Sequence, residues 1–325
     1  MRILFVTSTR VGDAVLSSGL LSYLIDSYPG ARITIACGPA AADLFRSVPG
    51  LERLIVLEKM IGSLHWLRLW VLCVGIWWDL VVDLRNAPLT YFLPASTQRH
   101  LRRNQKLEHR LIQISSVLGL ETNPRTPRLW VSEADLISAK KLIPEGAPVL
   151  AIGPTANWRA KTWRADRFAD LALKITGPGG ILPGGILPGG RVALFGRDDE
   201  RPGVMQLIEA LPKDRCLDLI GKPDLLQIYA CLQRCEIYVG NDSGLMHMAA
   251  AAGIPTLGLF GPSREELYGP WGINCGHVRT PQTFDSIHPE GFDHLTSDSL
   301  MDGLMVETVE EAVENIWRRK HEEIE

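Results

Sequence analysis

Residues 241–247 read Asn-Asp-Ser-Gly-Leu-Met-His and follow a short apolar run that is typical of a strand. Asp242 ends that run, and Ser243 and Gly244 stand where an alanine-rich helix would begin. The first N–H groups of a helix attract phosphate, and glycine lets an anion approach the backbone. The pattern therefore favours an anion site. A helix cap made by Asp or Ser, with His247 packed in the core, would explain the same residues.

A second group of candidate residues follows the apolar segment that ends at Gly153 and Pro154. The polar residues that come next carry Arg159 and Lys161, whose cationic side chains suit a diphosphate. The alternative is a solvated lysine, with Trp163 holding the following helix against a sheet. The residues themselves leave both interpretations open.

Two carboxylates stand after further strand-like runs. Glu200 ends the segment Phe195–Glu200, where an acidic residue can hold ribose hydroxyls as it does in dinucleotide-binding folds. Asp13 stands at the mouth of the first helix and would serve as a general base, although an Asp helix cap is the alternative. This turn contains only Gly12 and no G-x-G-x-x-G motif, which counts against a dinucleotide oxidoreductase.

The elements that must position these residues are strands and helices in alternation. Apolar segments rich in β-branched residues predict strands at 2–8, 31–37, 53–58, 79–85, 148–154, 191–196, 216–221, 236–242 and 255–261. Such strands, separated by helices, form parallel sheets covered on both faces. We therefore predict an α/β protein with two doubly wound domains, residues 1–145 and 146–325, joined near Pro144–Pro148. The prediction allows the last helix to pack back on the first domain. Ligands of open parallel sheets bind beyond the carboxyl ends of the strands, so we expect the site in the cleft between the domains.

The overall composition is that of a globular protein. The 325 residues are 46% apolar and 22% charged, with a formal charge of -3, so no global basic field favours nucleic acid. The six cysteines lack the spacing of a zinc site and are expected to be buried thiols. The N-terminal apolar run is too short for a secretory signal, and we expect a cytoplasmic monomer without a cofactor.

Two further segments depart from the alternation. The segment Ile61–Trp78 is apolar but contains His65 and Arg68, so it falls short of a membrane span. Its tryptophans indicate either a buried helix face or an interfacial anchor. Residues Gly177–Gly190 repeat Gly-Gly-Ile-Leu-Pro, which predicts a mobile insertion in a helix-to-strand loop.

Taken in order, "RVGDAVLSS", the "KTW" loop, "FGRDDE" and "NDSGLMHMAAAAGIPTLGLFGPS" resemble glycosyltransferase family 9, the lipopolysaccharide heptosyltransferases that use ADP-heptose. The resemblance extends from Arg2 to about Trp317. It implies a GT-B fold of two Rossmann-like domains, with an N-terminal acceptor domain and a C-terminal nucleotide-sugar domain. It also implies an inverting enzyme, peripheral on the inner face of the membrane. The alternatives are transfer from another nucleotide-sugar, or a non-catalytic nucleotide-sugar binding module, to which Asp13 would be useless.

The resemblance also implies a role for each candidate residue. Asp13 would remove the proton of the acceptor hydroxyl, Lys161 would stabilise the departing diphosphate without a metal ion, and Glu200 would hold the ribose. The family usually has small hydroxyl residues before the lysine, where this sequence has Ala156 and Asn157. The residues expected to bind the donor are therefore Thr155 or Asn157, together with Glu200, Asp242, Ser243, Gly244 and His247.

The acceptor is expected to meet a local basic run between Arg85 and Arg110. A solvated helix face would explain this run, and the sharper interpretation is contact with the acidic sugars and phosphates of a lipid A precursor at the membrane surface. The residues of the run are Arg99, His100, Arg102, Arg103, Lys106 and Arg110. Those expected to bind the acceptor are Arg10, Arg99, Arg102 and Arg103.

Overall fold

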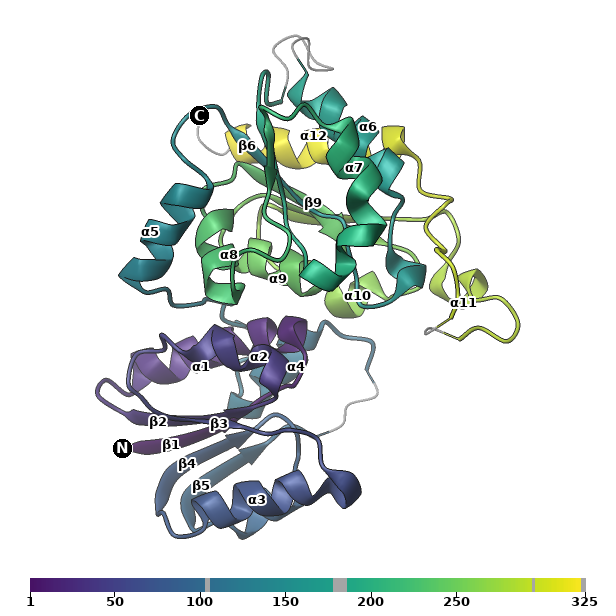
Figure 1. Cartoon of the computed structure of the whole chain (residues 1–325). Helices are drawn as coiled ribbons and strands as arrows, with labels where there is room; N and C mark the ends of the chain where they lie inside the picture. The colour runs from purple at the N-terminus through teal and green to yellow at the C-terminus, as the bar shows by residue number, and fades with distance from the viewer. Residues whose placement is uncertain (103–105, 178–185, 294–295, 323–325) are drawn as a thin grey trace. The chain divides into compact units, whose positions relative to one another are not determined.

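A computed structural model describes residues 1–102, 106–177, 186–293 and 296–322. The chain divides into two compact units, Met1–Ser132 and Glu133–Glu325, each built on a parallel sheet (Figure 1). The boundary was expected near residues 144–148, after helix α5 (Glu133–Leu142). In the structure the boundary lies before α5, because this helix contacts the second unit. There α5 packs against α8, and Arg234 Nε donates to the carbonyl of Ile143 at 2.7 Å.

The described part of the first unit contains a parallel sheet in the order β3-β2-β1-β4-β5. The strands are β1 (Arg2–Val6), β2 (Arg32–Cys37), β3 (Leu51–Val56), β4 (Trp78–Asp83) and β5 (Ala95–His100). Helices α1 (Val11–Ser27), α2 (Pro39–Ala42) and α4 (Arg110–Ser115) lie on one face of the sheet, and α3 (Leu64–Cys73) lies on the other (Figure 1). Short 3-10 helices are η1 (Asp43–Phe45), η2 (Ile61–Ser63), η3 (Pro88–Phe92) and η4 (Ser116–Leu118).

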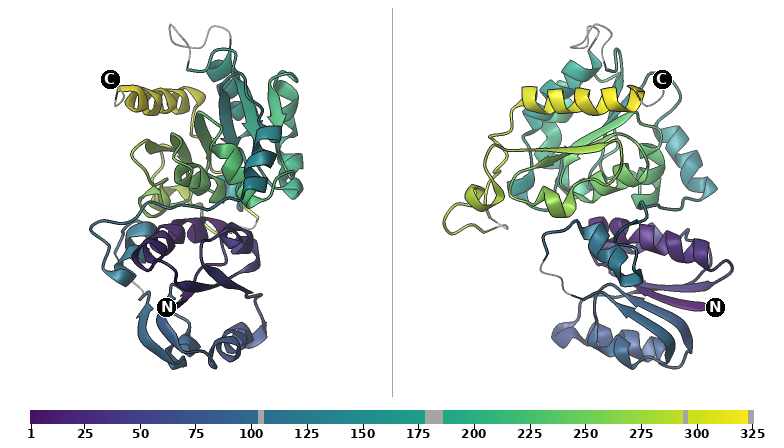
Figure 2. Two further views of the ribbon diagram at one scale, coloured as in Figure 1. Left: turned by 90° about the vertical axis from the view of Figure 1, so that its left-hand side faces the viewer. Right: turned by 180° about the vertical axis from the view of Figure 1, so that it is seen from behind.

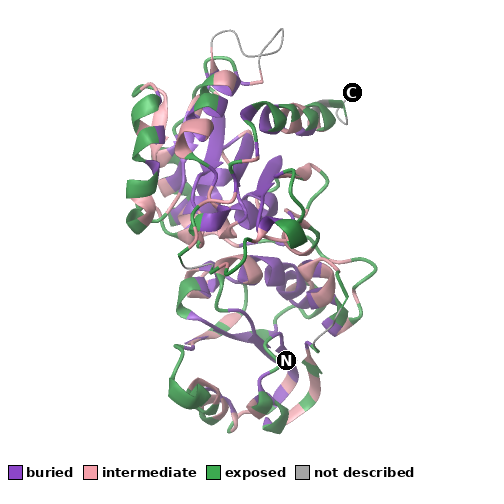
Figure 3. Ribbon diagram, turned by 90° about the vertical axis from the view of Figure 1, so that its right-hand side faces the viewer, coloured by how far each residue is buried: buried purple, intermediate pink, exposed green. Residues whose placement is uncertain are grey.

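The second unit is built on a parallel sheet in the order β11-β10-β9-β6-β7-β8 within its described residues. These strands are β6 (Val149–Gly153), β7 (Arg191–Leu194), β8 (Cys216–Asp218), β9 (Ile237–Asn241), β10 (Thr256–Phe260) and β11 (Cys275–Arg279). Figure 3 shows strands of this sheet in purple, the colour of buried residues. Strands covered on both faces in this way read as apolar runs, which is why their positions could be predicted.

Helices surround the second sheet, and α6, α9 and α12 pack directly on its strands. The helices of this unit are α5, α6 (Ala165–Thr176), α7 (Met205–Ala210), α8 (Leu225–Leu232), α9 (Gly244–Ala251), α10 (Glu265–Tyr268), α11 (Phe284–Ile287) and α12 (Val306–Glu322), with the 3-10 helices η5 (Arg159–Lys161) and η6 (Asp198–Val204). Helix α12, yellow in Figure 2, packs against α6, β10 and β11. One apolar cluster joins α6, α7 and α12 to the sheet.

The nine predicted strands are confirmed, but β5 and β11 were not expected. Both are edge strands, and their residues are partly buried or exposed. An edge strand need not be apolar, so the hydrophobic pattern carries no signal for it. The interpretation of the basic run as a solvated helix face is wrong, because Arg99 and His100 belong to β5.

The tryptophan-rich segment splits between core and surface. Trp78 is fully buried in β4, and Trp66 and Trp70 pack against the apolar cluster beneath α3, which confirms the buried interpretation for these three. Trp77 is 62% exposed and donates through Nε1 to Ser96 Oγ at 3.2 Å. Within the described residues, no helix has both the length and the apolar character that crossing a membrane requires.

The cysteines are free thiols, as predicted, and four of them are buried. Burial raises the pKa of Cys37 to about 12. Burial also raises the pKa of Cys73, to about 11, although the positive charge of Arg53 acts to lower it. These thiols are therefore protonated and unreactive at neutral pH. Of the predicted Gly-Pro insertion, residues 178–185 lie outside the described residues.

Candidate functional site

The strand order of the second sheet places its site between β6 and β9. From β6 the chain winds through β7 and β8 to one edge, and from β9 it winds through β10 and β11 to the other. Loops after β6 and β9 therefore leave in opposite directions, which opens a crevice for a ligand at the carboxyl ends of these strands. Lys161 follows β6, and Asp242 and Ser243 follow β9.

Lys161 forms a buried ion pair in this crevice. Its Nζ donates to the carbonyl oxygen of Asp242 at 3.0 Å and to Asp242 Oδ2 at 2.9 Å. The two side chains are 11% and 10% exposed, and Nζ lies 5.1 Å from the centre of the Trp158 ring. The interpretation of Lys161 as a solvated cation is thus wrong. An ammonium group has three donors, and these hydrogen bonds to described residues use two of them, so one can serve an anion.

Asn241 fixes the loop that carries Lys161. This fully buried residue ends β9, accepts the backbone N–H of Trp163 at 3.0 Å and donates to the carbonyl of Pro154 at 2.8 Å. Both ends of the loop are thereby tied to the strand that leads to Asp242. The role of Asn241 was missed by the sequence interpretation, although an amide at the end of an apolar strand was the available signal. Of the alternative interpretation of this loop, only the packing of Trp163 is observed, because its ring is fully buried.

The start of α9 lacks a side-chain cap. Ser243 occupies the capping position in an extended conformation, but its side chain makes no capping hydrogen bond. Since the Asp242 carboxylate accepts from Lys161, the interpretation of these residues as a helix cap is wrong. The first N–H groups of α9 lack partners within the helix and can receive an anion. His247 is buried in the same helix, and its role in donor binding stays a prediction.

The side chain of Tyr238 leaves no room for a Cβ atom at two positions of this sheet, which explains why both are glycine. A Cβ atom on Gly153 would lie 1.9 Å from the Tyr238 hydroxyl, and one on Gly240 would lie 2.3 Å from it. Burial raises the pKa of Tyr238. The phenol is therefore neutral and packs beneath the loops after β6 and β9.

Glu200 connects the loops that follow β6 and β7. Its Oε2 accepts Thr155 Oγ1 at 2.8 Å and the backbone N–H of Arg197 at 2.9 Å. Thr155 is buried, whereas Asn157 is exposed on the same loop. The structure thus brings two of the residues predicted to bind the donor into direct contact, and their contact with a donor stays a prediction.

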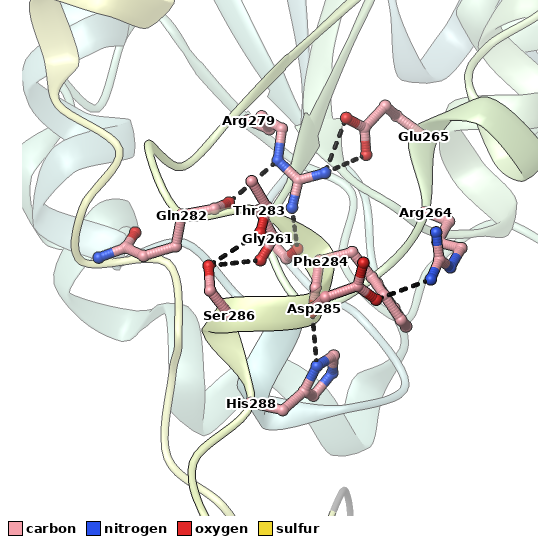
Figure 4. Close-up of polar contacts among 10 residues, drawn as sticks. All are labelled: Gly261, Arg264, Glu265, Arg279, Gln282, Thr283, Phe284, Asp285, Ser286 and His288. Atoms are coloured by element: carbon pink, nitrogen blue, oxygen red, sulfur yellow. Dashed lines mark hydrogen bonds and ion pairs between the residues drawn. The ribbon is translucent and has the colours of Figure 1, made fainter.

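The loop after β10 carries the Gly-Pro-Ser residues that ended the longest sequence motif. Arg279, at the end of β11, donates to the carboxylate of Glu265 and to the carbonyl of Gly261 at 3.0 Å (Figure 4). Burial raises the pKa of Glu265, but the hydrogen bonds from Arg279, a backbone hydrogen bond and the charges of Arg279 and His277 together outweigh it and leave that pKa below its usual range. Arg264 lies over the Phe284 ring and pairs with Asp285 at 3.0 Å. These contacts hold the loop in one conformation.

Asp13 lies at the corresponding place in the first unit, after β1 and next to the switch between β1 and β4. Helix α1 has its capping position at Arg10, so the interpretation of Asp13 as a cap is wrong. Ser8 Oγ lies 3.5 Å from Asp13 Oδ2, and Arg110 Nε lies 3.7 Å from Oδ1. Oδ1 accepts no hydrogen bond from the described residues. A carboxylate with an unused acceptor position can take a proton.

The basic run divides between two places. Arg110 belongs to α4 and faces Asp13, which the sequence interpretation missed. Arg99 and Arg102 instead border a pocket of about 620 Å³ on the edge of the sheet. The pocket is lined by Tyr91, Gln98, Arg99, His100, Arg102, Ser116 and Val117. Arg10 is exposed, and Arg103 lies outside the described residues.

One side of this pocket is built on a buried carboxylate. Asp83, at the end of β4, accepts Thr90 Oγ1 at 2.6 Å and the backbone N–H groups of Arg85 and Ala87 at 2.7 Å. His100 stacks on Tyr91 with 3.7 Å between the ring centres. The pocket wall is therefore fixed by hydrogen bonds and stacking.

The sequence and the fold match known proteins. A family model described as glycosyltransferase family 9 (heptosyltransferase) matches residues 84–288, a range that contains Lys161, Glu200 and Asp242. The chain is 26% identical over 307 residues to lipooligosaccharide heptosyltransferase 2 of Haemophilus influenzae, covering 83% of this chain and 86% of that protein.

Two solved structures share the fold. A glycosyl transferase family 9 protein from Veillonella parvula matches with a TM-score of 0.80 and 21% identity, covering 97% of each chain. The ADP-heptose lipopolysaccharide heptosyltransferase II of Escherichia coli matches with a TM-score of 0.72 and 21% identity, covering 99% of this chain and 100% of that one. The predicted GT-B fold is confirmed.

Proposed function

Because the chain belongs to glycosyltransferase family 9 (heptosyltransferase), we propose that it transfers a heptose from ADP-heptose to the inner core of lipopolysaccharide. The acceptor would be Kdo-lipid A or an already heptosylated core, met at the cytoplasmic face of the membrane. The buried pair of Lys161 and Asp242, beside the uncapped start of α9, is the observation that carries the proposal. A cation and free N–H groups at a switch point suit a diphosphate.

The donor then binds along the carboxyl ends of β6, β7 and β9. Lys161 and the N–H groups at Ser243 and Gly244 meet the diphosphate, and a helix N-terminus contributes roughly 0.3–2 kcal/mol to binding an anion. Glu200 Oε1, which lies 3.5 Å from Arg197 Nε, accepts from the ribose hydroxyls, since Oε2 already accepts from Thr155 and the Arg197 N–H. His247 and Asn157 complete the set of donor contacts.

The reaction is a single displacement that inverts the anomeric carbon. Asp13 takes the proton of the acceptor hydroxyl, and the oxygen forms a bond to the anomeric carbon of the heptose. The bond from that carbon to the diphosphate oxygen breaks, and ADP leaves with the electron pair. Stabilisation of a leaving group by prepositioned cations and N–H groups is a major source of rate acceleration.

The acceptor carries acidic sugars and phosphates, which suit the cationic pocket of the first unit. Arg99 and Arg102 line that pocket, and we assign them, with Arg10 and Arg103, to binding these groups. Lys161 and α9 supply the positive charge that a divalent cation supplies in other transferases. We therefore expect turnover to persist in a chelator, and a loss that added metal ions restore would contradict this assignment.

Nucleotide binding tests the donor directly. A ligand at 100 times its dissociation constant stabilises a folded protein by about 2.7 kcal/mol, which thermal unfolding detects. We expect ADP to raise the melting temperature and equal concentrations of UDP and GDP to leave it nearly unchanged. A shift with UDP or GDP but not with ADP would contradict the assignment to ADP-heptose and favour another nucleotide-sugar.

A further inference from the structure

Helix α3 exposes an apolar face that continues onto the short helices beside it. Ile61 is 93% exposed, Val71 is 61% exposed and Phe92 is 72% exposed. Leu64 and Leu67 are also exposed and, with Val71, repeat at the spacing that places side chains on one side of a helix. These five residues, from η2, α3 and η3, form what we call the α3 surface.

The opposite face of α3 is already packed. Leu69 and Cys73 are buried, and the partly buried Trp66 and Trp70 lie against the same apolar cluster of the sheet. Trp70 Nε1 also donates to the carbonyl of Phe92 at 3.4 Å, which fixes η3 beside α3. The α3 surface is therefore held on a rigid support and is not needed for the core of the unit. Exposed apolar groups gathered in one place mark a surface that meets an apolar partner.

Cationic side chains lie on and beside the α3 surface. Arg68 lies on the exposed side of α3, and Lys59 is exposed just before η2, where the exposed Glu58 precedes it in the sequence; residues 59–78 contain no Asp or Glu. Pairing of two copies through this surface would bring their Arg68 side chains together without a carboxylate from this segment to neutralise them. An anionic phospholipid surface satisfies both the apolar and the cationic side chains.

We infer that the α3 surface is where this protein docks on a membrane that contains anionic phospholipid. The ten residues of α3 span about 15 Å, too short for a hydrocarbon core of about 30 Å, so the helix lies along the interface. The inference rests on the proposed function in one respect, because a lipid-linked acceptor puts the reaction at a bilayer. It adds which surface of the protein faces that bilayer.

Sedimentation with lipid vesicles tests the inference on the full chain. The vesicles contain phosphatidylethanolamine and phosphatidylglycerol, and neither donor nor acceptor is added. The variant Leu67→Glu/Val71→Glu places two anionic groups on the α3 surface, and we expect it to bind these vesicles roughly tenfold more weakly than the unchanged protein. The control is Ile273→Glu, at a residue of the second unit that is 74% exposed, and we expect it to bind like the unchanged protein.

Two further measurements separate this inference from the proposed function. ADP should raise the melting temperature of the double variant as it does for the unchanged protein, which shows that the variant is folded. Transfer to a lipid-free core oligosaccharide should also be unchanged. Equal vesicle binding by the double variant and the unchanged protein would overturn the inference. So would a dimer of the unchanged protein that the double variant abolishes, because the α3 surface would then bind a second copy.

Discussion

Asp13 stands third in α1, with Ser8 and Arg110 beside its carboxylate oxygens. A residue at that position is not needed to cap the helix, and an Asp in the first turn gains only a fraction of a kcal/mol from the helix dipole. Its Oδ1 accepts no hydrogen bond from the described residues. The side chain thus contributes little to the fold and retains the acceptor position that a general base requires.

The change Asp13→Asn tests the proposed role of this residue as the general base. An amide cannot accept the proton of the acceptor hydroxyl, and loss of general-base assistance lowers rates by about 10²–10⁴-fold. We expect turnover to fall at least about a hundredfold, with the melting temperature and the affinity for ADP nearly unchanged. Asp26→Asn, at an exposed residue near the end of the same helix, is the matched control. Near-normal turnover in Asp13→Asn would remove this residue as the base.

Lys161 differs from Asp13 because its buried ion pair contributes to the fold in addition to its proposed role in the site. Lys161→Met leaves the Asp242 carboxylate buried without its cation, which costs about 3–5 kcal/mol of folding free energy. The double change Lys161→Met/Asp242→Asn removes both charges, so we expect much of this stability to return. ADP affinity and turnover should stay low in both variants, as isothermal titration and a transfer assay would measure. Recovery of turnover in the double variant would show that Lys161 has no part in catalysis.

The strand β9 positions the loop after β6 through Asn241. In Asn241→Ala the N–H of Trp163 and the carbonyl of Pro154 lose their partners, at about 1–3 kcal/mol for each group left unsatisfied. We expect chemical denaturation to show that loss, and the affinity for ADP to fall because the Lys161 loop is no longer fixed. The control Asn315→Ala changes an exposed residue of α12. Unchanged stability and ADP affinity in Asn241→Ala would contradict this role.

The hydrophobic pattern predicted the elements and the ends of strands at which the candidate residues stand. It could not predict β5, because the sequence of this edge strand is largely polar. The hydrophobic pattern also does not predict which residues pair when they are far apart in the sequence. Lys161 and Asp242 are 81 residues apart, and nothing in either motif indicates that they neutralise each other. In the same way, Arg110 resembled its basic neighbours until the packing of α4 on α1 placed it beside Asp13.

Helix α3 shows a different limit of sequence interpretation. The segment from 61 to 78 is apolar on nearly every side, so its periodicity cannot distinguish a face that packs in the core from one that meets solvent. The structure assigns Leu69 and Cys73 to the core and Leu67 and Val71 to the surface. The buried interpretation therefore applies to one face of this helix, and the opposite, exposed face is the one that we propose docks on a membrane.

The two units of the chain divide the proposed chemistry between them, each at its own switch point. Asp13 lies in the first unit, whereas Lys161 and the start of α9 lie in the second. In the proposed reaction, a hydroxyl activated at Asp13 attacks the anomeric carbon of a donor that Lys161 and α9 bind. This division is why changes at Asp13 should affect turnover alone, while changes at Lys161 should affect ADP binding as well.

Transfer of heptose to a lipid acceptor tests the central claim most directly. The purified chain is incubated with ADP-heptose and inner-core acceptors that lack heptose or carry one, and the products are analysed by mass spectrometry. We predict that one of these acceptors gains a single heptose and that an equal amount of ADP is released, with no transfer from UDP- or GDP-sugars. The account would be contradicted if no acceptor gained a heptose, or if a UDP- or GDP-sugar proved to be the donor.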